Sequence, residues 1–115
     1  MQNRKLVILV LSVIIVWSTI VFAVNNLDDK PSKGEVDIVV NQAGLLFRQK
    51  LQTGEDLSDG PCLSNALMPD WVVDIVHDPR IPSDDLPQNQ CPGFLEGRVK
   101  HFVELDLEGR LVRVK

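Results

Sequence analysis

The sequence lacks internal repeats, low-complexity tracts and any catalytic motif specific enough to name a reaction. These absences exclude a repeat architecture and leave no enzyme class that the residues identify. Cysteine is scarce, because the chain has only Cys62 and Cys91, and neither directly follows the apolar N-terminal run, where a lipid anchor would need it. No residue pattern implies a cofactor, and none is expected.

Basic residues are scarce beyond the N-terminus. From residue 25 onward there are ten Lys and Arg against sixteen Asp and Glu, which leaves a net charge of −6 on that part of the chain. Such a surface repels phosphate backbones and anionic lipid headgroups. Nucleic acid is therefore excluded as an expected partner, and the acidity also suits a small domain that charge keeps soluble.

A long apolar run dominates the N-terminus. Residues 6–24 carry no charge, and the polar residues among them are Ser12, Ser18 and Thr19. A helix of this length extends about 28 Å, close to the thickness of the hydrocarbon core of a bilayer. A helix in a soluble core would show polar residues at every third or fourth position. The run therefore predicts a transmembrane helix, with the membrane as its partner.

The charges that flank the run predict its orientation. Arg4 and Lys5 precede it, and positive charge stays on the cytoplasmic side of a membrane. Residues 1–5 are thus expected in the cytoplasm and the rest of the chain outside, attached to the cell membrane by one signal anchor. The alternative is a cleaved signal peptide, because Val21-Phe22-Ala23 fits the pattern before a cleavage site. Both alternatives place the domain in the same compartment.

The exported part begins with a short polar segment. Residues 25–33 have the composition of a linker, so we expect the folded domain over residues 34–115. Ser32 and Glu35 have the spacing of a capping box, in which each side chain accepts a hydrogen bond from the other's backbone amide. Apolar residues then recur at helical spacing and predict an amphipathic helix that ends near Gly54. These residues are Val36, Val39, Val40, Ala43, Leu46, Phe47 and Leu51.

The remainder of the domain is expected to be a sheet joined by loops. Residues 55–65 read as an irregular loop, and the β-branched run 71–77 reads as a strand. Residues 78–97 hold four prolines and predict a long loop, and 101–106 and 110–115 predict a hairpin. The fold class is therefore α+β, with one amphipathic helix packed on an antiparallel sheet of about three strands.

Two cysteines in an exported domain normally pair, so we expect a disulfide between Cys62 and Cys91. A loop of roughly 30 residues closed in this way stabilises the fold by about 3.7 kcal/mol in the chain-entropy treatment. The alternative is a catalytic thiol at Cys62 with His77 or His101 as its base.

The two histidines follow or begin predicted strands and could form a second site. If these strands are neighbours, His77 and His101 could converge with nearby acids such as Glu104 and Asp106 and bind a divalent metal ion. However, His101 and Glu104 are three residues apart on a strand, so they point to opposite faces. The alternative is that each histidine pairs locally with an acid or with solvent.

The proline-rich loop is the most plausible binding surface, because prolines reduce the entropy cost of holding a loop open. The sequence favours a disulfide-linked, membrane-anchored binding module for a protein or an envelope component. The alternative is a small metal- or thiol-dependent hydrolase that uses His77 and His101. The candidate binding residues are His77, Asp78, Arg80, Asp84, Asp85, Asn89 and His101.

Overall fold

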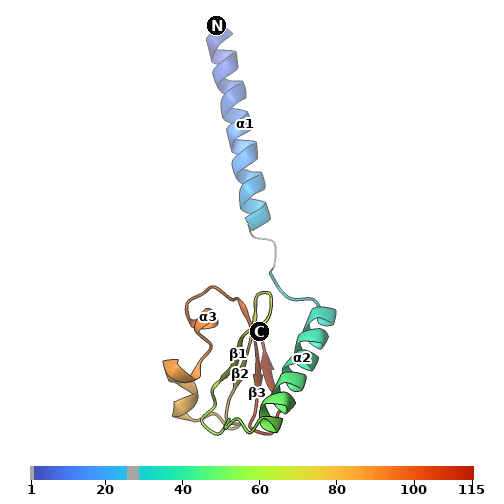
Figure 1. Cartoon of the computed structure of the whole chain (residues 1–115). Coiled ribbons are helices and arrows are strands. Elements are labelled where there is room, and N and C mark those ends of the chain that lie inside the picture. Colours follow the sequence, from blue (N-terminus) through green and yellow to red (C-terminus); the bar gives the residue numbers. More distant parts are fainter. Residues whose placement is uncertain (1, 26–28) are drawn as a thin grey trace. The chain divides into compact units, whose positions relative to one another are not determined.

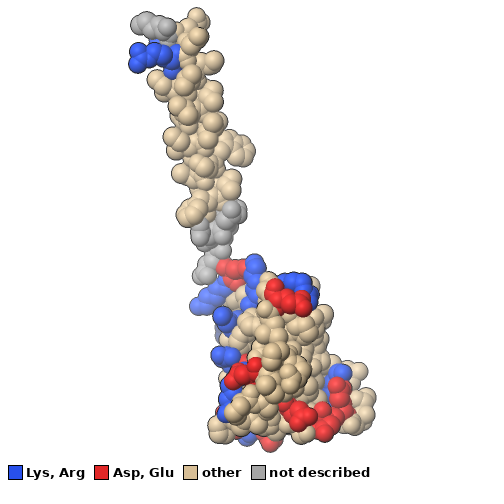
Figure 2. Space-filling model, turned by 90° about the vertical axis from the view of Figure 1, so that its left-hand side faces the viewer, with Lys and Arg blue, Asp and Glu red and all other residues tan. Residues whose placement is uncertain are grey.

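The computed structural model describes residues 2–25 and 29–115, which form two compact units, Met1–Lys30 and Pro31–Lys115. The first unit contains α1 (Gln2–Asn25), whose span Gln2–Ala23 is long and apolar enough to cross a membrane. Figure 2 shows it as an uncharged column with basic side chains only near its N-terminal end. Of the expected linker, residues 26–28 lie outside the described part.

The three hydroxyl groups in the apolar run of α1 are satisfied within the helix. The hydroxyl groups of Ser12, Ser18 and Thr19 each donate a hydrogen bond to the carbonyl oxygen three residues earlier, at 2.8, 2.9 and 2.8 Å. A polar group that is already hydrogen-bonded enters an apolar medium at a much lower cost than a free one. These three residues therefore do not prevent α1 from lying in a bilayer.

The second unit begins with α2 (Lys33–Gln52), the predicted amphipathic helix. Ser32 caps it by accepting a hydrogen bond from the Glu35 amide at 3.2 Å, as the capping box requires. The Glu35 carboxylate has a different role, because its Oε1 accepts a hydrogen bond at 2.8 Å from the indole nitrogen of Trp71. Glu35 therefore ties the start of α2 to the sheet.

The sheet has four strands, β1 (Cys62–Met68), β2 (Trp71–Ile75), β3 (His101–Leu105) and β4 (Leu111–Val114), in the order β1-β2-β3-β4. The α+β class is confirmed, but the expected three antiparallel strands are wrong. The pairs β1-β2 and β3-β4 are antiparallel, whereas β2 and β3 are parallel. The long connection between β2 and β3 returns the chain to the same end of the sheet, which parallel pairing requires.

Strand β1 was not predicted, because its sequence lacks the alternating pattern of a strand. Its residues, CLSNALM, do not alternate between apolar and polar, and two register shifts interrupt its pairing with β2. A strand of this kind is defined by its partner and not by its own pattern. The segment that was expected to be an irregular loop up to Asn65 therefore ends in an edge strand.

Both faces of the sheet are covered (Figure 1). On one face, α2 packs against the main core, while the other face holds a smaller apolar cluster. The second face lies under residues 76–100, here called the crossover segment, which contains η1 (Pro82–Asp85), η2 (Pro87–Asn89) and α3 (Pro92–Leu95). The prediction of a structureless loop is therefore wrong. The main core includes Val39, Ala43, Phe47, Trp71, Val73, Ile75, Val103 and Leu105.

The predicted hairpin is confirmed in β3 and β4. At the turn, the Asp106 side chain accepts hydrogen bonds at 2.9 Å from the amides of Glu108 and Arg110. Gly109 has a φ of +80°, a conformation that glycine adopts without strain, and it packs directly against the Phe47 ring. The turn is therefore fixed both by its own hydrogen bonds and by the end of α2.

Candidate functional site

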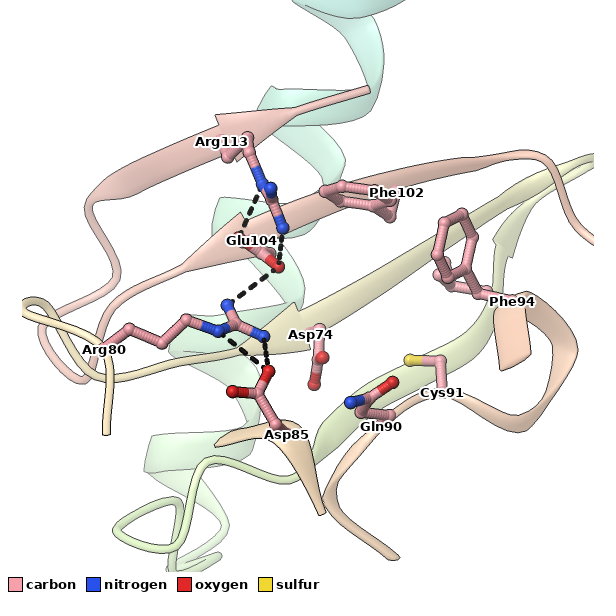
Figure 3. A pocket seen from close by; sticks show the side chains of 10 residues that line it. Asp74, Arg80, Asp85, Gln90, Cys91, Phe94, Phe102, Glu104 and Arg113 are labelled. Carbon is pink, nitrogen blue, oxygen red and sulfur yellow. Dashed lines mark hydrogen bonds and ion pairs between the residues drawn. The ribbon is translucent and has the colours of Figure 1, made fainter. Parts of the chain in front are cut away.

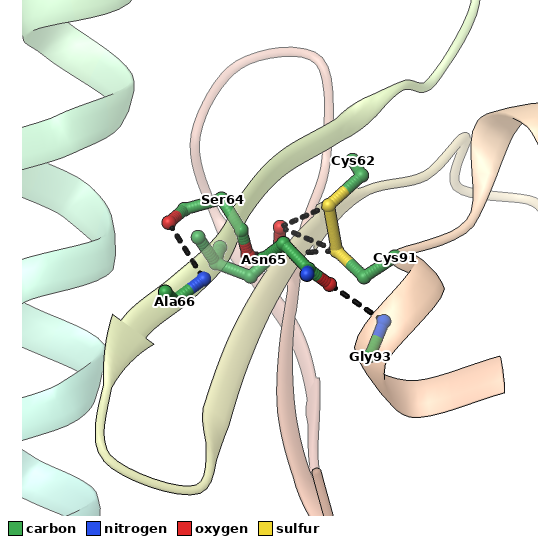
Figure 4. The surroundings of a disulfide bond; sticks show 7 residues. Cys62, Ser64, Asn65, Ala66, Cys91 and Gly93 are labelled. Atoms are coloured by element: carbon green, nitrogen blue, oxygen red, sulfur yellow. Dashed lines mark hydrogen bonds between the residues drawn. A yellow bond between two sulfur atoms is a disulfide. The ribbon is translucent and has the colours of Figure 1, made fainter. Parts of the chain in front are cut away.

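The predicted disulfide between Cys62 and Cys91 is present, with 4.8 Å between the Cα atoms (Figure 4). It joins the first residue of β1 to the residue that precedes α3. Close by, the Gly93 amide donates a 2.6 Å hydrogen bond to the side-chain oxygen of Asn65. These two links hold the crossover segment against β1. A bonded Cys62 has no thiol, so the alternative of a catalytic cysteine is wrong for this structure.

The two histidines do not converge. Because β2 and β3 are parallel and His101 lies opposite Trp71, His101 is at one end of the sheet, while His77 follows the other end of β2. Six residues of strand separate these ends by about 20 Å. His77 Nδ1 lies 2.8 Å from Asp84, and His101 Nε2 lies 3.7 Å from Asp70. The alternative of a joint metal or hydrolase site at His77 and His101 therefore does not hold in this structure, and each histidine pairs locally with an acid.

Asp84 is a structural anchor inside the crossover segment. It is 1% exposed and accepts hydrogen bonds from the amides of His77, at 3.2 Å, and of Ile81, at 2.9 Å. Burial alone would raise the pKa of Asp84, but the hydrogen bonds from His77 and Ile81 outweigh it and lower the pKa overall. The Asn89 side chain also bonds within the segment, to the Ser83 carbonyl at 2.8 Å. Asp84 and Asn89 therefore shape the segment through hydrogen bonds within it.

A pocket of about 210 Å³ lies between the crossover segment and the sheet (Figure 3). It contains two of the predicted binding residues, Arg80 and Asp85, whereas His77 and Asp78 line an adjoining hollow. The lining residues come from strands β2, β3 and β4 and from the crossover segment. They are Val72, Asp74, Arg80, Asp85, Gln90, Cys91, Phe94, Phe102, Glu104 and Arg113.

Ion pairs connect one side of the pocket to the other. Arg113 binds Glu104 with two nitrogens, at 3.1 and 2.9 Å, and Arg80 donates to the same carboxylate at 3.2 Å. Arg80 also donates to Asp85 at 3.1 and 2.9 Å. The guanidinium of Arg113 lies 4.9 Å from the centre of the Phe102 ring, within range of a cation–π contact. Glu104 is 5% exposed, so two arginines neutralise a buried charge.

Asp74 is the exception in this network. It lies opposite Glu104 in the parallel register, is 8% exposed, and its Oδ1 has no hydrogen-bond partner among the described residues. Burial raises the pKa of Asp74 to about 8, and the charge of Glu104 adds to the rise, while Arg80 opposes it. The carboxyl group is therefore largely protonated at neutral pH, and it can donate or accept a hydrogen bond in the pocket.

The sequence analysis did not identify Asp74, Gln90 and Arg113 as site residues. Asp74 interrupts an otherwise apolar strand, and this interruption was the one available signal. Its alignment with Glu104 depends on the parallel register, which no local pattern reveals. Comparisons of the chain with protein-family models, curated proteins and solved structures find no match. The function therefore has to be argued from this pocket and from the two units of the chain.

Proposed function

We propose that this chain is a single-pass membrane protein whose domain lies outside the cytoplasm and binds a partner through the pocket under the crossover segment. The apolar α1 supports the anchor, and the basic residues Arg4 and Lys5 at its start support a cytoplasmic N-terminus. The disulfide supports an oxidising compartment, because such bonds persist mainly outside the cytosol. The partner is a protein or a component of the cell envelope.

One observation carries the binding function, namely that Asp74 Oδ1, in the wall of a pocket, is buried without a hydrogen-bond partner among the described residues. A buried polar atom without a partner costs the fold about 1–3 kcal/mol, so such atoms are rare in proteins. An ionisable group with a strongly raised pKa inside a pocket is typical of functional sites. The arrangement favours a ligand that supplies the hydrogen bond or charge that Asp74 lacks.

The membrane topology can be tested on the full chain expressed in a bacterium that has a periplasm. We expect added protease to digest residues 31–115 in intact spheroplasts, and we expect intact mass to show cysteines that react with an alkylating agent only after reduction. The same mass shows whether residues 1–23 are retained or cleaved. A domain that is protected until lysis, with freely alkylated cysteines, would contradict an extracytoplasmic location.

Site-specific cross-linking tests the binding surface. A photo-reactive amino acid at Leu86, which is 43% exposed and follows Asp85, should give an adduct of defined mass in native membranes. The matched control is the same amino acid at Ile38, 55% exposed on α2, from which we expect no adduct. Adducts from Ile38 and none from Leu86 would place the binding surface on the helix and refute the pocket.

A further inference from the structure

Three carboxyl groups and two guanidinium groups line the pocket. Arg80 donates hydrogen bonds to both Glu104 and Asp85, and Arg113 donates both of its bonds to Glu104. Neither arginine donates a hydrogen bond to Asp74 Oδ1, which is unsatisfied within the part of the chain that the structure describes. When all three carboxyls are ionised, the pocket is therefore one positive group short of neutrality.

The walls around Asp74 suit a ligand with an apolar stem. Phe94 and Phe102 lie edge to face, with 4.9 Å between ring centres, and line the pocket together with Val72. The side chain of Gln90 lies beside Asp74 (Figure 3). In this view its amide nitrogen is the end nearer Asp74, and its amide oxygen lies on the far side. A stem could therefore rest on the rings while its charged end binds Asp74.

Other ligand classes fit these residues less well. Calcium binds six to eight oxygen ligands, whereas Glu104 is already held by two guanidinium groups, whose charges also repel a divalent ion. An anion would meet Asp74 and Asp85, and the arginine nitrogens that could bind it are already engaged with carboxylates. Once Asp74 has lost its proton, a single organic cation is the ligand that balances the charge.

The size of the pocket limits this cation to a small group. Sites that enclose whole drug-sized ligands measure about 300–1,000 Å³. The volume here is about 210 Å³, which suits one side chain or one small amine. An ammonium group is compact and has three donors, one of which can bind the unpartnered Oδ1 of Asp74.

We infer that the pocket binds a primary ammonium group on an alkyl stem, with Asp74 as its counter-ion and Phe94 and Phe102 beside the stem. This inference rests on the binding function proposed above and specifies its ligand chemistry. The ammonium group belongs either to a lysine side chain of a partner or to a free small amine.

Binding of the cation is coupled to ionisation of Asp74. Glu104 on β3 faces Asp74 and is itself paired with Arg113 of β4. The crossover segment adds Arg80, Asp84 and Asp85. On β1, Cys62 is held in the disulfide and does not titrate. Because the pKa of Asp74 is raised to about 8 in the empty pocket, a cation must displace a proton below that pH. Affinity should therefore increase by about tenfold per pH unit up to about pH 8 and then level off.

The test uses the full chain, labelled with ¹⁵N, in nonionic detergent micelles. It is titrated at pH 8 with n-butylammonium chloride while NMR follows the Asp74 backbone amide and the Gln90 side-chain amide. We expect saturable shifts that weaken at least about tenfold in Asp74→Asn, as loss of a desolvated charge partner predicts. The matched control is Asp59→Asn, an exposed carboxylate that does not line the pocket, which should bind as the wild type does. The uncharged 1-butanol should not shift these amides.

Further measurements distinguish a lysine side chain from a free amine as the source of the ammonium group. They also separate failure of the ammonium site from failure of the binding function. Tighter binding of acetyl-Gly-Lys-Gly-amide than of butylammonium assigns the site to a lysine side chain, and the reverse assigns it to a free amine. Equal binding by 1-butanol, undiminished binding by Asp74→Asn, or no saturable shift overturns the ammonium site. If the cross-link at Leu86 forms while butylammonium fails, the binding function stands and only this inference is wrong; if both fail, both are wrong.

Discussion

Replacing Asp74 with asparagine should abolish most of the loss of stability that the wild-type fold undergoes as pH rises from 5 to 8. The pKa of Asp74 is raised from 3.8 to about 8 in the folded chain, first by burial and then by the charge of Glu104. Between these two values the folded protein holds a proton that the unfolded chain has released. The free energy of unfolding therefore falls as pH rises through this window.

The magnitude follows from the number of protons involved. One proton held only by the folded state changes the free energy of unfolding by about 1.4 kcal/mol per pH unit. From pH 5 to pH 8 the wild-type protein should thus lose about 3–4 kcal/mol through this group, with the slope flattening near pH 8. The asparagine side chain has the same shape and does not ionise. The variant should therefore exceed the wild type by about 1.5 kcal/mol at pH 5 and by about 5 kcal/mol at pH 8.

Urea unfolding of the full chain in detergent micelles measures this difference. Trp71 is fully buried in the core, so its emission reports unfolding of the domain, and Trp17 is common to both proteins. The control is Asp59→Asn, the same charge change at an exposed carboxylate, which should follow the wild-type curve. If the curves of wild type and Asp74→Asn run parallel from pH 5 to pH 8, the reasoning from burial and from the charge of Glu104 is refuted.

Two further predictions concern how the domain is held together. Replacing both cysteines of the Cys62–Cys91 disulfide with serine should lower the free energy of unfolding by about 3.5–4 kcal/mol, since the bond closes a loop across 29 positions. Urea unfolding of the wild-type protein with and without reductant should show the same loss of stability. Gly109→Ala should cost about 2–5 kcal/mol, because the new Cβ would lie 2.5 Å from the buried Phe47 ring at a positive φ. Gly97→Ala, also at positive φ but with open space around it, should cost only about 1–2 kcal/mol. Equal melting temperatures for the two alanine variants would contradict the contact with Phe47.

Local signals account for the parts of the fold that the sequence predicted. The helix at α2 follows from apolar spacing and from Ser32 at its start, and the β3-β4 hairpin follows from Asp106 and Gly109 at its turn. Each of these signals lies within a few residues of the structure that it determines. The disulfide is the one long-range feature that was predicted, and it needed only a count of cysteines.

The parallel pairing of β2 with β3 could not be predicted from local sequence signals. Its direction depends on the path of the crossover segment, which brings His101 opposite Trp71 and thereby separates the two histidines. The same pairing aligns Asp74 with Glu104. This register could not be predicted from the sequence. It separates His77 from His101, which excludes the alternative of a joint histidine site, and it places Asp74 beside Glu104 in the pocket.

The disulfide and Asp74 have opposite effects on the stability of the same region. The bond holds the crossover segment against β1 and contributes about 3.5–4 kcal/mol, while the buried carboxyl costs about 5 kcal/mol near pH 8. Without the bond, the segment could move away and let water reach Asp74, which would relieve that cost. The covalent link therefore holds in place the segment that forms one wall of the pocket around this destabilising carboxyl. A fold that is selected for stability alone has no use for this combination, whereas a site that must bind a cation needs a fixed, desolvated counter-ion.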